Sequence, residues 1–131
     1  MTDRLRPWWP VALWCVMIVV LTTLPWSQAQ RASLPVDKVA HFFLYAVLGW
    51  LVGSALRKAG WTRIGAVVSA AAAVGLFALG DELHQAWVPT RVPAVEDWLA
   101  DMAGGAVGLL AVLRRGTGDE HREEGGTGSA P

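Results

Sequence analysis

The sequence predicts an all-α integral membrane protein, a bundle of four transmembrane helices. Of the 131 residues, 53% are hydrophobic and only 17% are charged. The apolar residues form long uncharged runs instead of alternating or lying in narrow amphipathic stripes. A bilayer core about 30 Å thick requires runs of about 17–25 such residues to cross it. A lipid bilayer is therefore the expected solvent for most of this chain.

Each expected helix corresponds to one apolar run. The four runs cover residues 8–24, 39–56, 64–80 and 98–113. The second run contains His41, and the fourth contains Asp101. Because the fourth run is short for a membrane span, we expect its helix to begin near Pro93, a residue type suited to a first helical turn.

The first run has a second interpretation. Arg4 and Arg6 precede an apolar stretch, and small residues follow near Ala29, which together also describe a secretory signal peptide. The apolar region of a signal peptide is usually about 7–15 residues long, which is shorter than this run. We therefore expect the first helix to be retained.

The distribution of basic residues predicts the orientation of the bundle. Cytoplasmic loops of membrane proteins are enriched in Lys and Arg. With four antiparallel spans, one side holds eight of these residues: Arg4, Arg6, Arg57, Lys58, Arg63, Arg114, Arg115 and Arg122. The other side holds three: Arg31, Lys38 and Arg91. Both termini are thus expected in the cytoplasm.

Composition sets the remaining limits on the chain. We expect one domain over residues 1–115, followed by a disordered cytoplasmic tail over 116–131, because the tail is polar and rich in Gly. Cys15 is the only cysteine, so it cannot form an internal disulfide, and a small buried apolar role is favoured. The formal net charge is zero, with no basic block outside the helix ends, which argues against a nucleic-acid partner.

Polar and small residues share one face of the second expected helix. Asp37, His41 and Tyr45 follow one another at intervals of four residues, and Gly49 and Gly53 continue the same face deeper into the span. The polar part of this face is expected at the outer end of the helix.

The fourth expected helix repeats this arrangement with Asp97, Asp101, Gly104 and Gly108. A pair of glycines four residues apart lets the backbone of another helix approach closely. We therefore expect the glycine faces to be buried and the carboxylates to face protein instead of lipid.

The outer end of the third helix and the loop after it add further polar groups. They are Asp81, Glu82 and Gln85, followed by Arg91 between two prolines. An unpaired ionisable residue within a span costs about 2.5–3.5 kcal/mol on insertion scales. The presence of His41 and Asp101 therefore predicts a functional site at the outer ends of three helices.

Structural roles compete with this hypothesis. Charges at the headgroup level could simply be solvated helix ends; the residues concerned are Asp37, Lys38, Asp81, Glu82 and Glu96. His41 could be a core histidine satisfied by Asp37 or by a neighbouring helix. Asp97 could do no more than pair with Arg91, and Tyr45 could serve packing.

Two segments resemble the VanZ-like family of small bacterial membrane proteins. They are LPVDKVAHFFLYAVLGWLVG, residues 34–53, and DELHQAWVPTRVPAVEDWLADMAGGAVG, residues 81–108. The matching positions are Asp37, Lys38, His41, Phe42, Tyr45, Gly49, Asp81, Glu82, Gln85, Pro89, Arg91 and Asp97. The family pattern often has Asn four residues after its last Asp, where this chain has Asp101.

The resemblance implies a multi-pass protein of the bacterial cytoplasmic membrane. The family takes its name from an association with low-level resistance to the glycopeptide teicoplanin, and its members have been suggested to act on lipids or lipid-linked headgroups. The implied partners are membrane lipids and phosphate-containing headgroups.

One hypothesis for the function is a headgroup hydrolase or transferase. His41, oriented by Asp37, would be the general base or nucleophile, and Glu82 or Asp97 would donate a proton or position the substrate. Arg91 and Lys38 would hold phosphate oxygens. The full set of expected substrate-binding residues is Lys38, Tyr45, Gln85, Arg91 and Asp101.

The candidate site as a whole has an excess of negative charge, which raises the question of a bound cation. Six acids stand against two basic residues, so some carboxyls take up protons, a divalent cation binds among them, or the acids are not all gathered in one place. No recognised metal-ligand spacing is present, because Glu82 and His84 point to different helix faces. The sequence therefore assigns no metal ligands.

Two further hypotheses remain open from the sequence. A non-catalytic protein could bind or transport a headgroup or precursor, although four short helices leave little room for alternating gates unless copies assemble through their glycine faces. Alternatively, the polar groups could form a network that only stabilises the fold.

Overall fold

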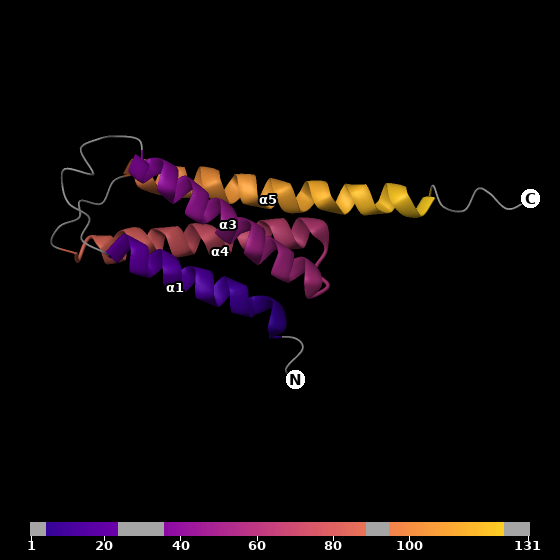
Figure 1. The fold of residues 1–131 in the computed structure, drawn as a ribbon, viewed down its shortest axis with the longest axis horizontal. Helices are drawn as coiled ribbons and strands as arrows, with labels where there is room; N and C mark the ends of the chain where they lie inside the picture. The colour runs from indigo at the N-terminus through magenta and orange to yellow at the C-terminus, as the bar shows by residue number, and fades with distance from the viewer. Residues whose placement is uncertain (1–4, 24–35, 89–94, 125–131) are drawn as a thin grey trace, which may run out of the picture.

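A computed structural model describes residues 5–23, 36–88 and 95–124, and these residues are helical except for short turns. Figure 1 shows four long helices, which confirms the predicted all-α class. A short 3-10 turn, η1, precedes them. The elements in chain order are η1 (Arg6–Trp8), α1 (Trp9–Thr23), α3 (Val36–Lys58), α4 (Arg63–Gln85) and α5 (Val95–Glu124).

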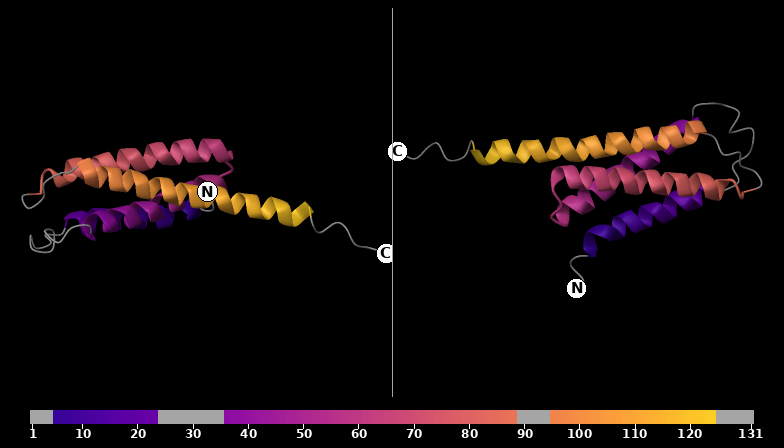
Figure 2. Two further views of the ribbon diagram at one scale, coloured as in Figure 1. Left: turned by 90° about the horizontal axis from the view of Figure 1, so that it is seen from above. Right: turned by 180° about the vertical axis from the view of Figure 1, so that it is seen from behind.

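The helices lie side by side and alternate in direction along the chain. Helices α1 and α4 run toward one end of the bundle, whereas α3 and α5 run away from it, as the views in Figures 1 and 2 show. The most extensive packing joins α3 to α5, and α4 contacts both of them. Helix α1 lies against α3 and α4, so the first span is part of the bundle.

Glycines allow α3 and α5 to pack with their backbones in contact. Gly49, Gly104 and Gly108 are buried, as the sequence predicts. A methyl group at residue 104 would collide with the Phe42 backbone, and one at residue 108 would collide with that of Ala46. Side chains larger than hydrogen therefore cannot stand at these positions without separating the two helices.

A short turn joins α3 to α4 and satisfies both helix ends. Gly60 adopts a positive φ of 87°, and its amide donates to the carbonyl of Arg57. The next amide, of Trp61, donates to the carbonyl of Leu56. This pair of bonds is the Schellman arrangement that ends many helices at a glycine. Thr62 then caps α4, since its hydroxyl accepts a hydrogen bond from the Gly65 amide at 3.1 Å.

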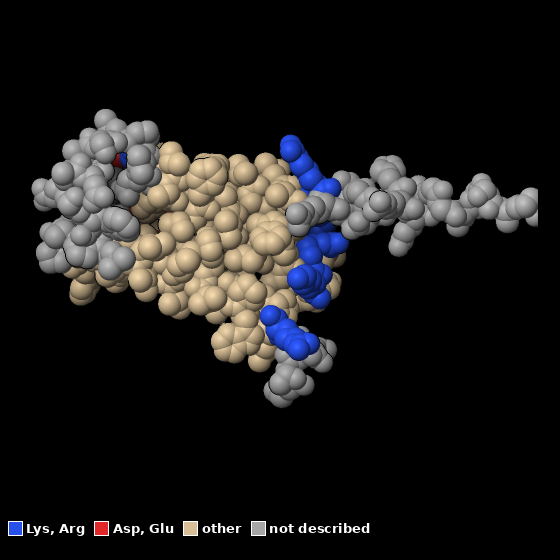
Figure 3. Space-filling model, viewed as in Figure 1, with Lys and Arg blue, Asp and Glu red and all other residues tan. Residues whose placement is uncertain are grey.

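Three helices are long and apolar enough to cross a membrane within the described residues. The spans are Arg6–Thr23, Lys38–Lys58 and Arg63–Gln85. Helix α5 packs against two of them, and its crossing of the bilayer stays a prediction. Figure 3 shows a band of Lys and Arg at one end of a largely uncharged surface. The basic residues that the structure describes there are Arg6, Arg57, Lys58 and Arg63 at helix ends and Arg114 within α5.

Helix α5 continues past the predicted domain boundary at residue 115 and ends at Glu124. The sequence predicts a tail without structure from Gly116 onward, but the first part of that tail is helical. Extending an existing helix costs less than nucleating a new one, which accounts for the difference. The boundary itself stays a prediction, and residues 125–131 lie outside the described part.

Candidate functional site

Buried polar side chains gather at the end of the bundle opposite the basic band. All four long helices contribute to this group, which we call the polar cluster. Its members are Thr22, His41, Asp81, Glu82, Gln85, Asp97 and Asp101. The rest of the described core is apolar, with Tyr45, Leu48 and Val74 among its largest buried side chains. The polar groups are thus concentrated at one level of the bundle.

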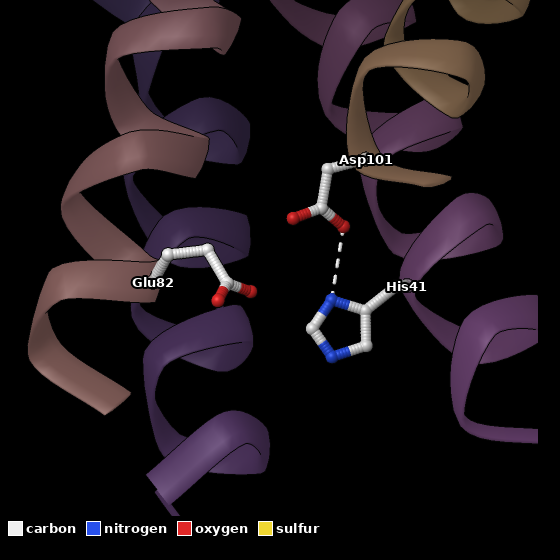
Figure 4. Close-up of side chains that lie close together, drawn as sticks. All are labelled: His41, Glu82 and Asp101. Carbon is white, nitrogen blue, oxygen red and sulfur yellow. Dashed lines mark hydrogen bonds and ion pairs between the residues drawn. The ribbon is translucent and has the colours of Figure 1, made fainter. Parts of the chain in front are cut away.

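Three members of the cluster, His41, Glu82 and Asp101, come from three different helices and face one another (Figure 4). The Nδ1 atom of His41 lies 2.9 Å from Oδ1 of Asp101. His41 is 2% exposed and Asp101 is fully buried, so this contact is shielded from solvent and lipid. A carboxylate at this distance fixes the imidazole tautomer and stabilises the protonated ring.

Asp81 is a second centre of hydrogen bonding within the cluster. Its Oδ1 accepts from the Thr22 hydroxyl at 2.9 Å. Its Oδ2 accepts from the Gln85 amide at 3.1 Å and from the Tyr45 hydroxyl at 3.4 Å. These bonds join α1, α3 and α4 around one carboxylate, which gives Asp81 a positioning role in the bundle.

Lys38 and Asp97 form an ion pair at the edge of the cluster. The Nζ atom of Lys38 is 3.1 Å from Oδ1 of Asp97 and 3.9 Å from Oε2 of Glu96. The Lys38 side chain is 41% exposed, whereas that of Asp97 is 10% exposed. The ammonium group is therefore accessible from outside while it remains held by the bundle.

Helix packing brings these residues together. His41 and Tyr45 lie on the face of α3 that its glycines continue, and Asp97 and Asp101 lie on the glycine face of α5. On α4 the buried positions Val74, Ala78 and Glu82 recur every four residues, which places them on one side of the helix. Small residues deep in the bundle thus allow the polar residues above them to approach each other.

Two contacts of the cluster join α3 to α5. The sequence offers Asp37 or a neighbouring helix as the partner of His41, and the structure shows a contact with Asp101 on a neighbouring helix. Lys38 contacts Asp97 in the same way. The expected pairings of His41 with Asp37 and of Asp97 with Arg91 stay predictions. Arg91, Pro89 and the side chain of Asp37 lie outside the described residues.

Tyr45 and Gln85, expected to bind substrate, are both buried and donate to Asp81. The sequence places Asp81 among the cluster acids without assigning it a role, and it does not identify Thr22 at all. Thr22 lies one turn after the buried residue Ile18, at the same end of the bundle as the other polar groups. Helix α1 is apolar on all sides, so its sequence does not indicate which face is buried.

Three side chains suited to binding a metal, one imidazole and two carboxylates, occur together in the described structure. His41, Glu82 and Asp101 each offer one ligand atom, and these atoms lie within 4.8 Å of one another. Because the three residues come from three helices, no spacing along the chain could show this group. An imidazole with two carboxylates can accept and release protons or bind a divalent cation.

An apolar groove lies deeper in the bundle, between α4 and α5. Its volume is about 280 Å³, and its lining includes Val67, Val74, Met102 and Leu109. The groove continues along the same faces of α4 and α5 that carry Glu82 and Asp101. Apolar residues line the groove, and its lining includes none of the polar residues that the sequence predicts for a pocket.

The fold and the cluster define a small helical membrane protein with a buried polar centre at one end. A family model described as VanZ/LLP1 matches residues 8–115, which include all the members of the cluster. The chain therefore belongs to the VanZ/LLP1 family, as the resemblance of its two motif segments predicts. No curated protein and no solved structure matches the chain.

Proposed function

We propose that the protein acts on a phosphate-bearing headgroup of a membrane lipid or lipid-linked precursor, by hydrolysis or group transfer. The observation that carries this proposal is the gathering of seven buried polar side chains from four helices at one end of an apolar bundle. Ionisable residues within spans are costly, and they commonly mark substrate paths or proton relays.

The position of the cluster favours the outer leaflet. The cluster lies at the end of the helices opposite the band of Lys and Arg. Because cytoplasmic loops retain positive charge, we place the basic end in the cytoplasm of a bacterial cell. The cluster would then meet lipid headgroups at the outer surface of the cytoplasmic membrane. The likeness to VanZ-like proteins supports this location and a link to teicoplanin resistance.

The cluster offers two kinds of group that phosphate chemistry requires. Lys38 is accessible at the edge and would attract phosphate oxygens as a point charge, and the sequence offers Arg91 for the same role. Deeper inside, His41, Glu82 and Asp101 would activate a water or hydroxyl nucleophile by accepting its proton. The pairing of His41 with Asp101 supports this role, since it fixes the orientation of the ring.

The groove between α4 and α5 supports a lipid as the substrate. A hydrocarbon chain lying along Val74 and Leu109 would point its polar end toward Glu82 and Asp101. Ligand sites generally combine a mostly apolar lining with a few convergent polar groups. The groove and the cluster together have this composition.

A turnover assay in nanodiscs tests the proposal. The purified protein would receive phosphatidic acid, phosphatidylglycerol or a polyprenyl diphosphate, and released phosphate or headgroup would be quantified by mass spectrometry. We expect His41→Gln to lower turnover by about 10²–10⁴, the usual contribution of a positioned acid or base. His84→Gln is the matched control, because His84 is exposed on the same helix as Glu82 and should leave turnover unchanged.

Two outcomes would contradict the proposed enzymatic function. Equal turnover in His41→Gln and His84→Gln would remove His41 from the reaction. Lipid bound in native mass spectra without any product would indicate a headgroup-binding or transport protein instead. In that case Arg91→Ala would abolish lipid binding, whereas His41→Gln would be tolerated.

A further inference from the structure

We propose that His41, Glu82 and Asp101 bind a divalent transition-metal cation of the Zn²⁺ or Mn²⁺ class. Only one part of the proposal rests on the proposed function, namely that the bound cation would contact a phosphate group. The binding of the cation itself is carried by the geometry and burial of the three side chains.

The three ligand atoms already lie close to the arrangement that a metal requires. They are within 4.8 Å of one another. Ligand atoms about 2.0–2.2 Å from a common Zn²⁺ lie about 3.4 Å apart in tetrahedral geometry. A side-chain movement of about 1 Å would therefore complete the site, and Figure 4 shows the three groups turned toward one another.

Asp101 supplies an independent reason to expect a ligand. Its Oδ1 contacts His41, but its Oδ2 is buried and accepts no hydrogen bond from any residue in the described ranges. Buried polar atoms in native proteins almost always have a partner, so such an oxygen needs an explanation. A cation between Asp101 and Glu82 would provide the missing partner for this oxygen.

Charge balance favours the same conclusion. With neutral imidazole, Glu82 and Asp101 bring two formal negative charges into a buried region. Buried carboxylates require a paired charge or a proton. A divalent cation would balance both carboxylates at once.

The ligand types select the class of metal. Mg²⁺ and Ca²⁺ prefer oxygen ligands throughout, whereas imidazole nitrogen suits Zn²⁺; Mn²⁺ would bind chiefly through the two carboxylates of the set. Three protein ligands also leave a coordination position open, as in catalytic zinc sites and in contrast to closed structural ones. That open position would be available to water or to a phosphate oxygen.

The bundle holds the ligands in place before any cation arrives. His41 and Asp101 are on the two helices that pack through glycine backbones, and Glu82 is on α4, which contacts both. Ligands on rigid, closely packed elements are positioned more precisely than ligands on loops. The site would therefore select a cation by geometry and by ligand type.

Metal content measures the proposal directly. The full chain would be purified in detergent without a polyhistidine tag, stripped with a chelator, reloaded with Zn²⁺ or Mn²⁺, desalted and analysed by inductively coupled plasma mass spectrometry. We expect stoichiometric metal in the wild type and its loss in His41→Gln, Glu82→Gln and Asp101→Asn. The matched controls His84→Gln and Glu96→Gln change exposed residues and should keep the metal.

A spectroscopic measurement on the wild type covers the case in which a variant fails to fold. Co²⁺-loaded protein should show the visible absorption of a low-symmetry site with nitrogen and oxygen ligands, and no thiolate charge-transfer band from Cys15. A wild type that retains no metal after reloading would overturn the proposal. Metal retained equally by folded His41→Gln, Glu82→Gln and Asp101→Asn would overturn it as well.

The outcome for the metal is separable from the outcome for the proposed function. Metal bound by the wild type and lost in the three variants, without turnover of any lipid, would support the cation and refute the reaction. Turnover by a wild type that binds no metal would support the reaction and refute the cation.

Discussion

Replacing Gly104 by Ala tests whether the close contact of α3 and α5 builds the polar cluster. A Cβ atom at residue 104 would lie 2.8 Å from the carbonyl carbon of Phe42 and 3.0 Å from its Cα. Non-bonded carbon atoms normally lie about 3.5–4.0 Å apart. Because backbone faces backbone here, no side chain can rotate away. The two helices would have to separate by about 1 Å.

This separation would also act on His41 and Asp101, which lie on the same two helices. Their 2.9 Å contact would lengthen beyond the usual hydrogen-bond range of about 2.7–3.2 Å. Overpacking costs about 1–3 kcal/mol, and loss of a hydrogen bond to a charged group costs about 1.5–3 kcal/mol. Since the two effects overlap, we expect the free energy of unfolding to fall by about 2–4 kcal/mol.

Reversible unfolding in mixed detergent micelles, followed by circular dichroism, measures the difference. Gly80→Ala is the matched control, because Gly80 is exposed on α4 and a Cβ there would meet nothing within 4 Å. Ala is more stable than Gly inside a helix by about 0.5–1 kcal/mol, so this control should be as stable as the wild type or more so. If Gly104→Ala matched Gly80→Ala, the reasoning about backbone contact would be refuted.

Two further predictions concern single hydrogen bonds and charges. Thr22→Ala should lower the free energy of unfolding by about 1–3 kcal/mol, because it removes a buried donor to Asp81. Thermal unfolding should show a smaller effect for the control Thr23→Ala, since Thr23 is exposed. Equal effects of the two substitutions would argue against the Asp81 network. Lys38→Met should raise KM for a lipid phosphate about tenfold or more with less change in kcat, since a charged contact to phosphate is lost. An unchanged KM would place the phosphate away from the Lys38–Asp97 pair.

The sequence is sufficient to predict the helices and their buried faces. Long uncharged runs leave few alternatives to transmembrane helices, and the four predicted runs correspond to α1, α3, α4 and α5. Spacings of four and of three residues correctly predict that His41 shares a buried face with Gly49, and Asp101 with Gly104. The end of α5 is predicted less well, because Gly116 and its neighbours favour a coil while the preceding helix favours extension.

The partners within the cluster are beyond what the sequence can predict. Helical spacing tells which residues share a face, but the partner across an interface depends on the rotation and depth at which two helices cross. Spacing along α3 therefore offers the local candidate Asp37 for His41, whereas the contact of His41 with Asp101 exists only once α3 and α5 are packed. The grouping of His41, Glu82 and Asp101 likewise cannot be seen until three helices are packed.

Position 101 shows how the packing and the chemistry of this chain depend on each other. The VanZ-like pattern that the two motif segments resemble is expected to have Asn there, and an amide could still accept a hydrogen bond from His41 or donate one to it. An amide would not add charge, however, and would not need a cation. This chain has a carboxylate instead, fully buried and next to Glu82. Such a residue is tolerable at membrane depth only with a proton or a cation beside it. The expected departure from the family pattern therefore falls on a residue of the proposed ligand set.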